Sequence, residues 1–356
     1  LARERGKNGN PEPFNIKYWG LGNENWGGGG AMTPEDYCAV YRKYGVMCYS
    51  VYPEGKYIAC GANDSIPDWT PKFFERYAQM YTEGRKPPLY GYSLHYYVSN
   101  FGKLGSEMQY TDAQWYESLR MAWDIEPFIV RQAAMLDAAV PDNDIALIVD
   151  EWGLWHQQNG RTPKPGHFLF EQPSNMREAV LAAISLNVFN NHCDRVKMAN
   201  IAQLVNCIHS LFLAHEDKFV TTTTYHVFDM YQAHYNADCV KSEVESSIKE
   251  YEIEGQKQSV PEISCSASLK DHTLTLTLAN LSLDNEQEVS LNLLGGVLNG
   301  TCNLTVLSST SEKDGNSFDE PEKVIPKTSQ INLDPKDPKI TLPKASVVLL
   351  SIPVNL

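Results

Sequence analysis

The chain has 356 residues, a net charge of -14, 42% hydrophobic residues and 21% charged residues. This length exceeds one ordinary core and predicts two domains of a globular protein. The acidic balance argues against nucleic acid as a partner, because phosphate binding needs a basic face. No stretch approaches the roughly 18 uninterrupted apolar residues of a membrane span. Eight scattered cysteines without a CxxC pair indicate buried free thiols in a reducing compartment, so we expect a cytoplasmic protein.

The first motif follows a polar opening segment and occupies residues 17–26. It reads Lys-Tyr-Trp-Gly-Leu-Gly-Asn-Glu-Asn-Trp, a short apolar run that ends on Asn23 and Glu24 before four glycines, Gly27 to Gly30. An apolar run bounded by glycine suits a buried parallel strand. A carboxylate at the C-terminal tip of such a strand lies where α/β barrels carry their chemistry, so Glu24 is a candidate catalytic group.

Helices and strands alternate over the next part of the chain. Thr33 and Pro34, followed by two acids, form a good helix start, and Thr70 with Pro71 repeats the device. We expect helices at about 33–48, 70–80, 111–140 and 176–191, and strands at 18–22, 57–62, 89–97 and 145–153. Residues 197–206 are expected to form a last strand or a strand–helix junction. This alternation predicts a parallel α/β architecture for residues 1–236.

The pattern changes at about residue 237. Apolar and polar residues alternate strictly at 273–278 and again at 289–293. Further short strands are expected at 303–307, 331–333, 340–342 and 346–352. Residues 237–356 are therefore predicted to form an antiparallel β-sandwich of jelly-roll type, and nothing in them resembles a catalytic cluster.

A second strand also ends on a glutamate. Residues 145–153 read Ile-Ala-Leu-Ile-Val-Asp-Glu-Trp-Gly, which delivers Glu151 at the strand exit. Two carboxylates at strand tips can divide the acid and nucleophile roles of a glycosidase between them. For one such glutamate, capping a helix or pairing with an arginine is the commoner explanation. For Glu24 and Glu151 together, each flanked by Trp and by Asn or Asp, a paired-carboxylate site is favoured.

His95 and Tyr97 are alternate residues near the end of the strand at 89–97, so their side chains point the same way. A tyrosine hydroxyl there can orient a carboxylate nucleophile, whereas a lone histidine is more often a satisfied core residue. Gln203, on the last strand, can bond sugar hydroxyls or satisfy barrel backbone.

No metal or cofactor is expected from the motifs. Residues 192–194 read His-Cys-Asp but lack partner ligands at a known spacing, and no HExxH occurs. Gly27 to Gly30 do not form a phosphate loop, because no Gly-Lys-Ser/Thr follows them.

The two glutamate motifs, at 18–27 and 149–153, resemble those of the family 51 glycoside hydrolases, the α-L-arabinofuranosidases. Supporting matches lie at 93–97, 190–203, 224–231 and 316–319. The resemblance covers nearly the whole chain. It implies a (β/α)₈ TIM barrel followed by a β-sandwich, and hydrolysis with retention of configuration.

The resemblance also implies roles for single residues. Glu24 would be the acid/base, Glu151 the nucleophile and Asn23 a ligand of the sugar 2-hydroxyl. The glycone subsite would be lined by Tyr97 and Gln203, with His95 behind them. We also expect Trp152 to bind substrate. The implied substrates are the terminal non-reducing α-L-arabinofuranosyl groups of arabinan, arabinoxylan or arabino-oligosaccharides.

The chain departs from the family pattern at its start. Its strands correspond to the fourth through eighth of the barrel, so we expect a further N-terminal segment or a separate chain to complete the barrel. Without that segment, we expect the chain not to fold stably. Family members are often oligomeric, which implies a homo-oligomer. The alternatives are another two-glutamate barrel glycosidase, such as an endoglucanase or β-xylosidase, and a non-catalytic carbohydrate-binding fragment.

Overall fold

The computed structural model describes residues 1–356 except 83–86, 100–102, 142, 157–169, 299 and 356. The chain divides into two units. Unit 1 comprises Leu1–His95 and Val130–Ile148, and unit 2 comprises Tyr96–Ile129 and Val149–Leu356. Among the described residues, no helix combines the length and the apolar character that a bilayer crossing requires.

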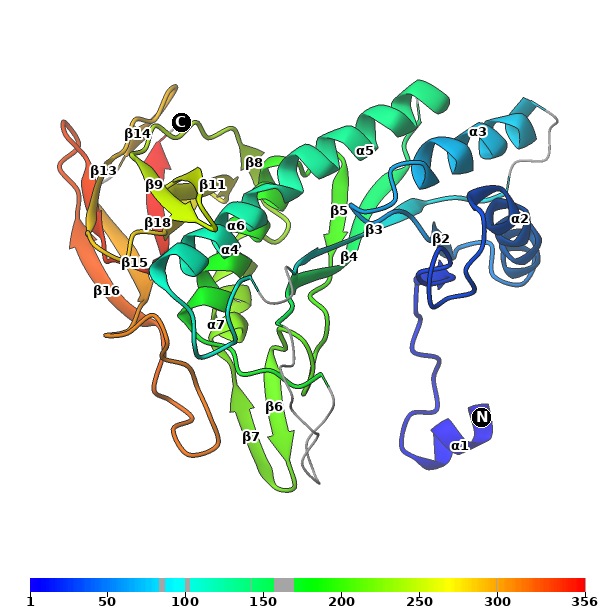
Figure 1. The fold of residues 1–356 in the computed structure, drawn as a ribbon, viewed down its shortest axis with the longest axis horizontal. Coiled ribbons are helices and arrows are strands. Elements are labelled where there is room, and N and C mark those ends of the chain that lie inside the picture. The colour runs from blue at the N-terminus through cyan, green and yellow to red at the C-terminus, as the bar shows by residue number, and fades with distance from the viewer. Residues whose placement is uncertain (83–86, 100–102, 142, 157–169, 299, 356) are drawn as a thin grey trace. The chain divides into compact units, whose positions relative to one another are not determined.

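A five-stranded sheet follows the predicted α/β alternation, and its strand order β1-β2-β3-β4-β5 is that of the sequence (Figure 1). The strands are β1 (Tyr18–Leu21), β2 (Lys56–Ala59), β3 (Gly91–Val98), β4 (Ala146–Leu154) and β5 (Val196–Ala199). The β1–β2 and β2–β3 pairs are parallel. All five strands lie within or beside their predicted ranges.

The helices that alternate with these strands have clear sequence signals. They are α1 (Ala2–Lys7), α2 (Pro34–Val51), α3 (Trp69–Thr82), α4 (Asp112–Trp123), α5 (Ile125–Ala139), α6 (Met176–Asn191), α7 (Thr223–Tyr231) and the 3₁₀ turn η1 (Gln232–His234). The Thr33 side chain caps α2 by accepting from the backbone N–H of Asp36. Thr111 and Gln114 form a capping box at the start of α4.

The prediction of one helix over 111–140 is wrong, because the chain breaks at Asp124 into α4 and α5. Pro127 is the third residue of α5. Proline has no backbone N–H and its ring clashes with the preceding turn, so it is tolerated in the first turn of a helix and not in its interior.

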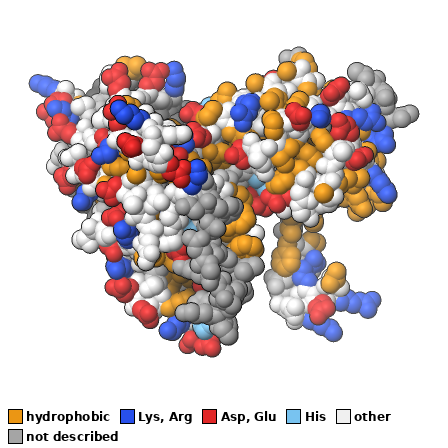
Figure 2. Space-filling view, viewed as in Figure 1, with side chains coloured by type: hydrophobic (Ala, Val, Ile, Leu, Met, Phe, Trp, Pro, Cys, Tyr) orange, Lys and Arg blue, Asp and Glu red, His pale blue; other side chains and the backbone are white. Residues whose placement is uncertain are grey.

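Aromatic packing forms the core of unit 1. Tyr37 on α2 stacks on Trp69 of α3 with ring centroids 5.7 Å apart, and Phe73 lies 5.4 Å from Tyr92 on β3. The opposite face of α2 exposes the apolar side chains Val40, Tyr44, Val46, Met47, Tyr49 and Val51. Hydrophobic side chains are visible at the surface in the region of α2 and α3 (Figure 2).

Antiparallel strands make up most of the rest of unit 2. The main sheet has the order β16-β15-β18-β12-β11-β8, with β14 beside β18, and the smaller pairs are β9–β10, β13–β17 and β6–β7. The bounds are β6 (Phe212–His215), β7 (Lys218–Thr221), β8 (Asp238–Val240), β9 (Ile248–Ile253), β10 (Gln256–Pro261), β11 (Ile263–Lys270), β12 (Thr273–Asn280), β13 (Gln287–Ser290), β14 (Val297–Leu298), β15 (Thr301–Leu307), β16 (Lys327–Asn332), β17 (Lys339–Leu342) and β18 (Ser346–Asn355).

The β-rich part has two layers around one core. Leu278 of β12 and Leu350 of β18 share a buried cluster with Ile340 and Leu342 of β17, which belongs to a separate sheet. Two sheets that bury their apolar faces against each other constitute a sandwich. The change from helices to antiparallel strands falls between η1 and β8, beside the boundary at 236/237, which stays a prediction.

Candidate active site

Glu24 lies in a tight turn directly after β1. Its backbone is in the left-handed region, with φ of 45°. Its carbonyl oxygen accepts hydrogen bonds from the N–H groups of Gly27 at 2.8 Å and Gly29 at 3.0 Å. A Cβ on Gly29 would lie 1.8 Å from the carbonyl oxygen of Asn23, so only glycine fits there. The glycine run therefore holds the backbone of the candidate acid.

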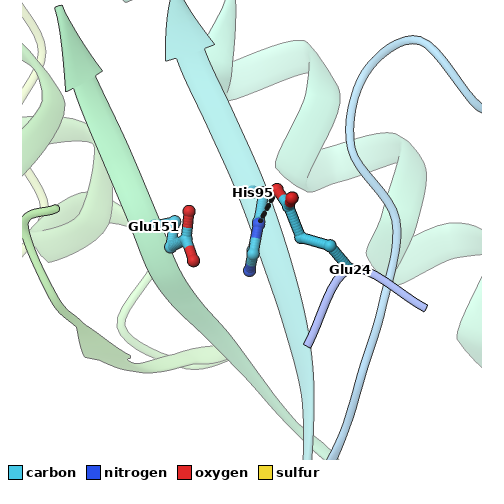
Figure 3. A group of neighbouring side chains, drawn as sticks. All are labelled: Glu24, His95 and Glu151. Carbon is cyan, nitrogen blue, oxygen red and sulfur yellow. Dashed lines mark hydrogen bonds and ion pairs between the residues drawn. The ribbon is translucent and has the colours of Figure 1, made fainter. Parts of the chain in front are cut away.

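The carboxylate of Glu24 is held by a buried histidine of β3. Glu24 Oε1 lies 2.9 Å from Nδ1 of His95 (Figure 3), and His95 is 3% exposed. When the carboxylate is ionised it can only accept, so Nδ1–H of His95 donates in this bond. The Trp26 ring approaches His95 edge-on at 6.3 Å and donates its Nε1–H to the carbonyl oxygen of Gly61 at 3.0 Å. Sequence analysis did not assign Trp26 this role.

Glu151 lies in β4, a strand that is buried or half-buried along its whole length. The Tyr97 hydroxyl donates to Glu151 Oε2 at 2.8 Å, as predicted for an orienting tyrosine. The ring of Trp155 packs edge-on against Tyr97 at 5.2 Å. Figure 3 draws Glu151 on β4. A charge-assisted bond from a packed tyrosine fixes the direction of the carboxylate. Trp155 directly follows β4, and no sequence pattern indicated its contact with Tyr97.

A buried histidine supports the backbone just after Glu151. Gly153 has φ of 135°, and a Cβ there would lie 2.6 Å from Nδ1 of His209. That nitrogen accepts from the N–H of Leu154 at 2.9 Å, and Nε2–H donates to the carbonyl oxygen of Glu178 at 3.1 Å. Burial lowers the pKa of His209 to about 4, so the ring is neutral at neutral pH.

An ionic cluster lies at the start of α6. His156 Nε2 lies 2.7 Å from Glu178 Oε1, and both side chains are buried. The fully buried Arg177 donates to the carbonyl oxygen of Leu104 at 3.0 Å and lies 3.7 Å from the Tyr110 ring centroid. Burial opposes ionisation of Glu178, but the hydrogen bond from His156 and the charge of Arg177 outweigh it and lower the pKa of Glu178. The pKa of His156 is also lowered, because its ring is buried. The cluster ties α6 to the segment that follows β4.

The remaining predicted site residues occupy different settings. Asn23 is exposed in the Glu24 turn, and Gln203 is exposed after a cis peptide bond to Ala202. Trp152 is fully buried and stacks on Phe228 with ring centroids 5.9 Å apart. Since neighbouring strand residues point to opposite faces, Trp152 points away from Glu151 into the core. Substrate contact by Asn23, Gln203 and Trp152 stays a prediction.

Family models and known proteins resemble this chain over nearly its full length. Residues 150–346 match the α-L-arabinofuranosidase C-terminal domain and residues 1–115 the α-L-arabinofuranosidase 1 domain. An intracellular exo-α-L-arabinofuranosidase of Bacteroides ovatus is 33% identical over 99% of this chain and 66% of its own length. A probable α-L-arabinofuranosidase C of Aspergillus clavatus is 26% identical over 81% of this chain. The chain spans 57% of that second relative.

Solved structures show the same fold. The GH51 arabinofuranosidase of Xanthomonas axonopodis pv. citri is 29% identical with a TM-score of 0.85, covering 99% of this chain and 69% of its own. The α-L-arabinofuranosidase of Thermotoga maritima, in its arabinose complex, is 22% identical with a TM-score of 0.79, covering 98% of this chain and 69% of its own. These likenesses confirm the predicted fold class, part of an eight-stranded barrel followed by a sandwich.

Proposed function

Because this chain belongs to the GH51 α-L-arabinofuranosidases, we propose that it hydrolyses terminal non-reducing α-L-arabinofuranosyl groups with retention of configuration. Arabinan, arabinoxylan and arabino-oligosaccharides are the proposed substrates. The names of the relatives from Bacteroides ovatus and Bacillus subtilis, both intracellular exo-arabinofuranosidases, support attack at chain ends and an intracellular location.

The observation that carries this proposal is the pair of contacts made from β3. His95 holds the carboxylate of Glu24, and Tyr97, two residues further along the same strand, holds the carboxylate of Glu151. Alternate residues of a strand lie on one face. A single strand face therefore supplies one orienting side chain for each of the two glutamates, which a paired-carboxylate mechanism requires and which helix capping would not produce.

In the proposed mechanism Glu24 is the acid/base and Glu151 the nucleophile. Glu24 protonates the leaving oxygen while a carboxylate oxygen of Glu151 attacks the anomeric carbon, forming a glycosyl-enzyme. Glu24, now ionised, takes a proton from water, which attacks the same carbon and releases arabinose with the original configuration. His95 and Tyr97 keep the two carboxylates in position through both steps.

The test is the Glu151→Ala variant with an aryl α-L-arabinofuranoside. Turnover should be lost, and added azide should restore it by filling the vacated position and giving the inverted glycosyl azide. A panel of aryl glucosides, xylosides and arabinofuranosides with the unchanged protein serves as the control for sugar specificity. Wild-type turnover by Glu151→Ala would contradict the nucleophile assignment, and a preference for xylosides would contradict the substrate assignment.

We also propose that a further polypeptide segment, on the same or a separate chain, completes the barrel beside β1. Among the described residues β1 pairs with β2 alone, and Trp19 on it is 44% exposed. The apolar outer face of α2 is likewise uncovered. Open sheet edges and large apolar faces are normally covered in a folded enzyme. Self-association of the complete enzyme is proposed from the family resemblance.

Thermal unfolding tests this second proposal. The 356-residue chain alone should lack a single cooperative transition, because its parallel sheet is open at β1. Supplying the corresponding segment of a relative, fused or as a second chain, should produce one. A sharp transition of the isolated chain as a monomer would contradict the proposal without bearing on the roles of Glu24 and Glu151.

A further inference from the structure

The cysteines of the described structure differ sharply in exposure. Cys38, Cys60, Cys265 and Cys302 are buried, and Cys48 and Cys207 are partly buried. Cys193 and Cys239 are both exposed, which departs from the prediction of scattered buried thiols. Cys193 follows the C-terminal end of α6, whereas Cys239 is the middle residue of β8. The two exposed thiols therefore come from separate elements, both within unit 2.

These two cysteines meet at one backbone carbonyl. The Sγ of Cys239 lies 3.5 Å from the carbonyl oxygen of Asn190, and the backbone N–H of Cys193 donates to the same oxygen at 3.3 Å. Both cysteines therefore contact the same backbone oxygen. A disulfide needs two cysteines whose Cα atoms lie within about 7 Å of each other, and the shared carbonyl oxygen brings these two residues together.

Strand β11 holds both sides of this pair. Cys239 of β8 is paired with Ser268 of β11 in the antiparallel ladder. The end of α6 is bonded to the same strand, because Asn190 Nδ2 donates to Ser266 Oγ at 3.0 Å and Asn191 Nδ2 donates to the Cys265 carbonyl oxygen at 3.0 Å. The two cysteines are therefore brought together by elements that are both bonded to β11.

We propose that Cys193 and Cys239 are a redox modification site that forms a reversible intramolecular disulfide with glutathione disulfide as the oxidant. Exposed cysteine pairs of this kind form the labile disulfides that respond to the redox state of a compartment. The other six cysteines are buried or partly buried, so Cys193 and Cys239 are the most accessible thiols.

The exchange proceeds in two steps that balance. The Cys193 thiolate attacks one sulfur of glutathione disulfide, forming a mixed disulfide and expelling one glutathione thiolate. Cys239 then loses its proton to solvent and attacks the Cys193 sulfur, expelling the second glutathione. The two protein thiols lose two electrons and the oxidant gains them. Partial desolvation of its sulfur and the neighbouring Cys193 raise the pKa of Cys239 to about 11, so Cys239 is a thiol at neutral pH and takes the second step.

The crosslink would close a loop that contains β5, the β6–β7 hairpin and α7. Closing a loop of this length restricts the unfolded chain and should raise Tm by about 5 °C. The strongest effect is expected on the segment that carries Gln203 and His209, because it lies wholly inside the loop.

Mass spectrometry tests the proposal on the complete protein. The reduced protein is incubated with glutathione disulfide, alkylated, and digested without reduction. We expect a linked peptide pair containing Cys193 and Cys239, which dithiothreitol separates. The Cys193→Ser variant should lose this pair, whereas Cys207→Ser, a change at a partly buried cysteine within the same loop, should retain it.

Two outcomes would overturn the proposal. One is a protein in which Cys193 and Cys239 end as separate glutathione adducts or remain free after equilibration. The other is a crosslink found only between copies, seen as a dimer on a non-reducing gel. The wild-type digest decides between these outcomes and the proposed one, so the result stands even if a serine variant folds poorly.

Discussion

The two candidate catalytic glutamates are held by different physical devices. Glu24 lies in a left-handed turn after the short strand β1, where glycine N–H groups fix its backbone. Glu151 lies inside the nine-residue strand β4, where neighbouring strands fix the backbone and Tyr97 fixes the side chain. The comparison indicates that the acid should be sensitive to small changes of its turn, whereas the nucleophile should be sensitive mainly to changes of its side-chain partner.

The largest expected effect separates the chemical roles of the two glutamates. Glu151→Ala should lower kcat by at least about 10⁴-fold for every aryl arabinofuranoside, because no glycosyl-enzyme can form. Glu24→Ala should lower kcat by about 10²–10⁴-fold for a poor leaving group, which needs a proton. The same variant should lose much less kcat with a dinitrophenyl substrate, because dinitrophenolate leaves without being protonated. Steady-state kinetics with both leaving groups measures the difference. Equal losses of kcat for both leaving groups in Glu24→Ala would contradict the assignment of Glu24 as the proton donor.

The next effect concerns the turn alone. Gly29→Ala should lower kcat/KM by about 10²-fold, since the added methyl meets the Asn23 carbonyl oxygen and displaces Glu24 by a fraction of an ångström or more. Gly28→Ala is the matched control, because a Cβ there has no atom within 4 Å. If both variants lose activity equally, the loss comes from stiffening of the loop and the turn is not the holding device.

A smaller effect is expected at the partner of the nucleophile. Tyr97→Phe removes the 2.8 Å hydrogen bond to Glu151 and should lower kcat by about tenfold, the value of one charge-assisted hydrogen bond. Tyr96→Phe is the control on the same strand, since its hydroxyl donates to the Met121 carbonyl oxygen. It should reduce Tm and leave kcat unchanged. A normal kcat in Tyr97→Phe would mean that β4 alone orients Glu151.

The smallest expected effect is a difference between the two units in how their stability depends on pH. Burial lowers the pKa of His156, His209, His226 and His234, all in unit 2, and those of His209 and His234 fall to about 4. The unfolded chain binds these protons near pH 6.5 and the folded chain does not, so stability present above pH 6.5 is lost as pH falls toward 4. Unit 1 contains one histidine, His95.

Hydrogen exchange at pH 5 and pH 7.5 measures this difference. Amides of unit 2 should lose protection at pH 5 more than those of unit 1. His234→Gln can keep the hydrogen bonds to Ser268 and Thr277 while removing one titrating group. Unfolding of the variant in acid should then take up about one proton fewer, so its Tm should fall less steeply as the pH is lowered. Equal loss of protection in both units would assign the acid sensitivity to carboxylates.

The elements that sequence predicts well are those with a local signal. The helix start at Thr33 and the strand that carries Glu151 follow from capping and apolar runs over a few residues. The break at Asp124 also has a local signal, since Pro127 must lie in a first helical turn. The prediction of one helix over 111–140 did not use that signal.

The elements that were missed depend on residues far apart in the chain. The support of Leu154 by His209 spans 55 positions, and no spacing in the sequence indicates it. The approach of Cys193 and Cys239 to one carbonyl oxygen likewise depends on α6 and β8 both bonding to β11. Strand β9 alternates exposed and half-buried residues, so it presents a weak apolar pattern and was not predicted.

Strand β3 places a constraint on insertions and deletions that substitutions do not reveal. Exchanging His95 or Tyr97 affects one glutamate at a time. Removing a single residue within β3 ahead of His95 would turn both side chains to the opposite face together, and both carboxylates would lose their partners in one event. Functional relatives should therefore accept length changes in the loops on both sides of β3 and accept none between Ser93 and Tyr97.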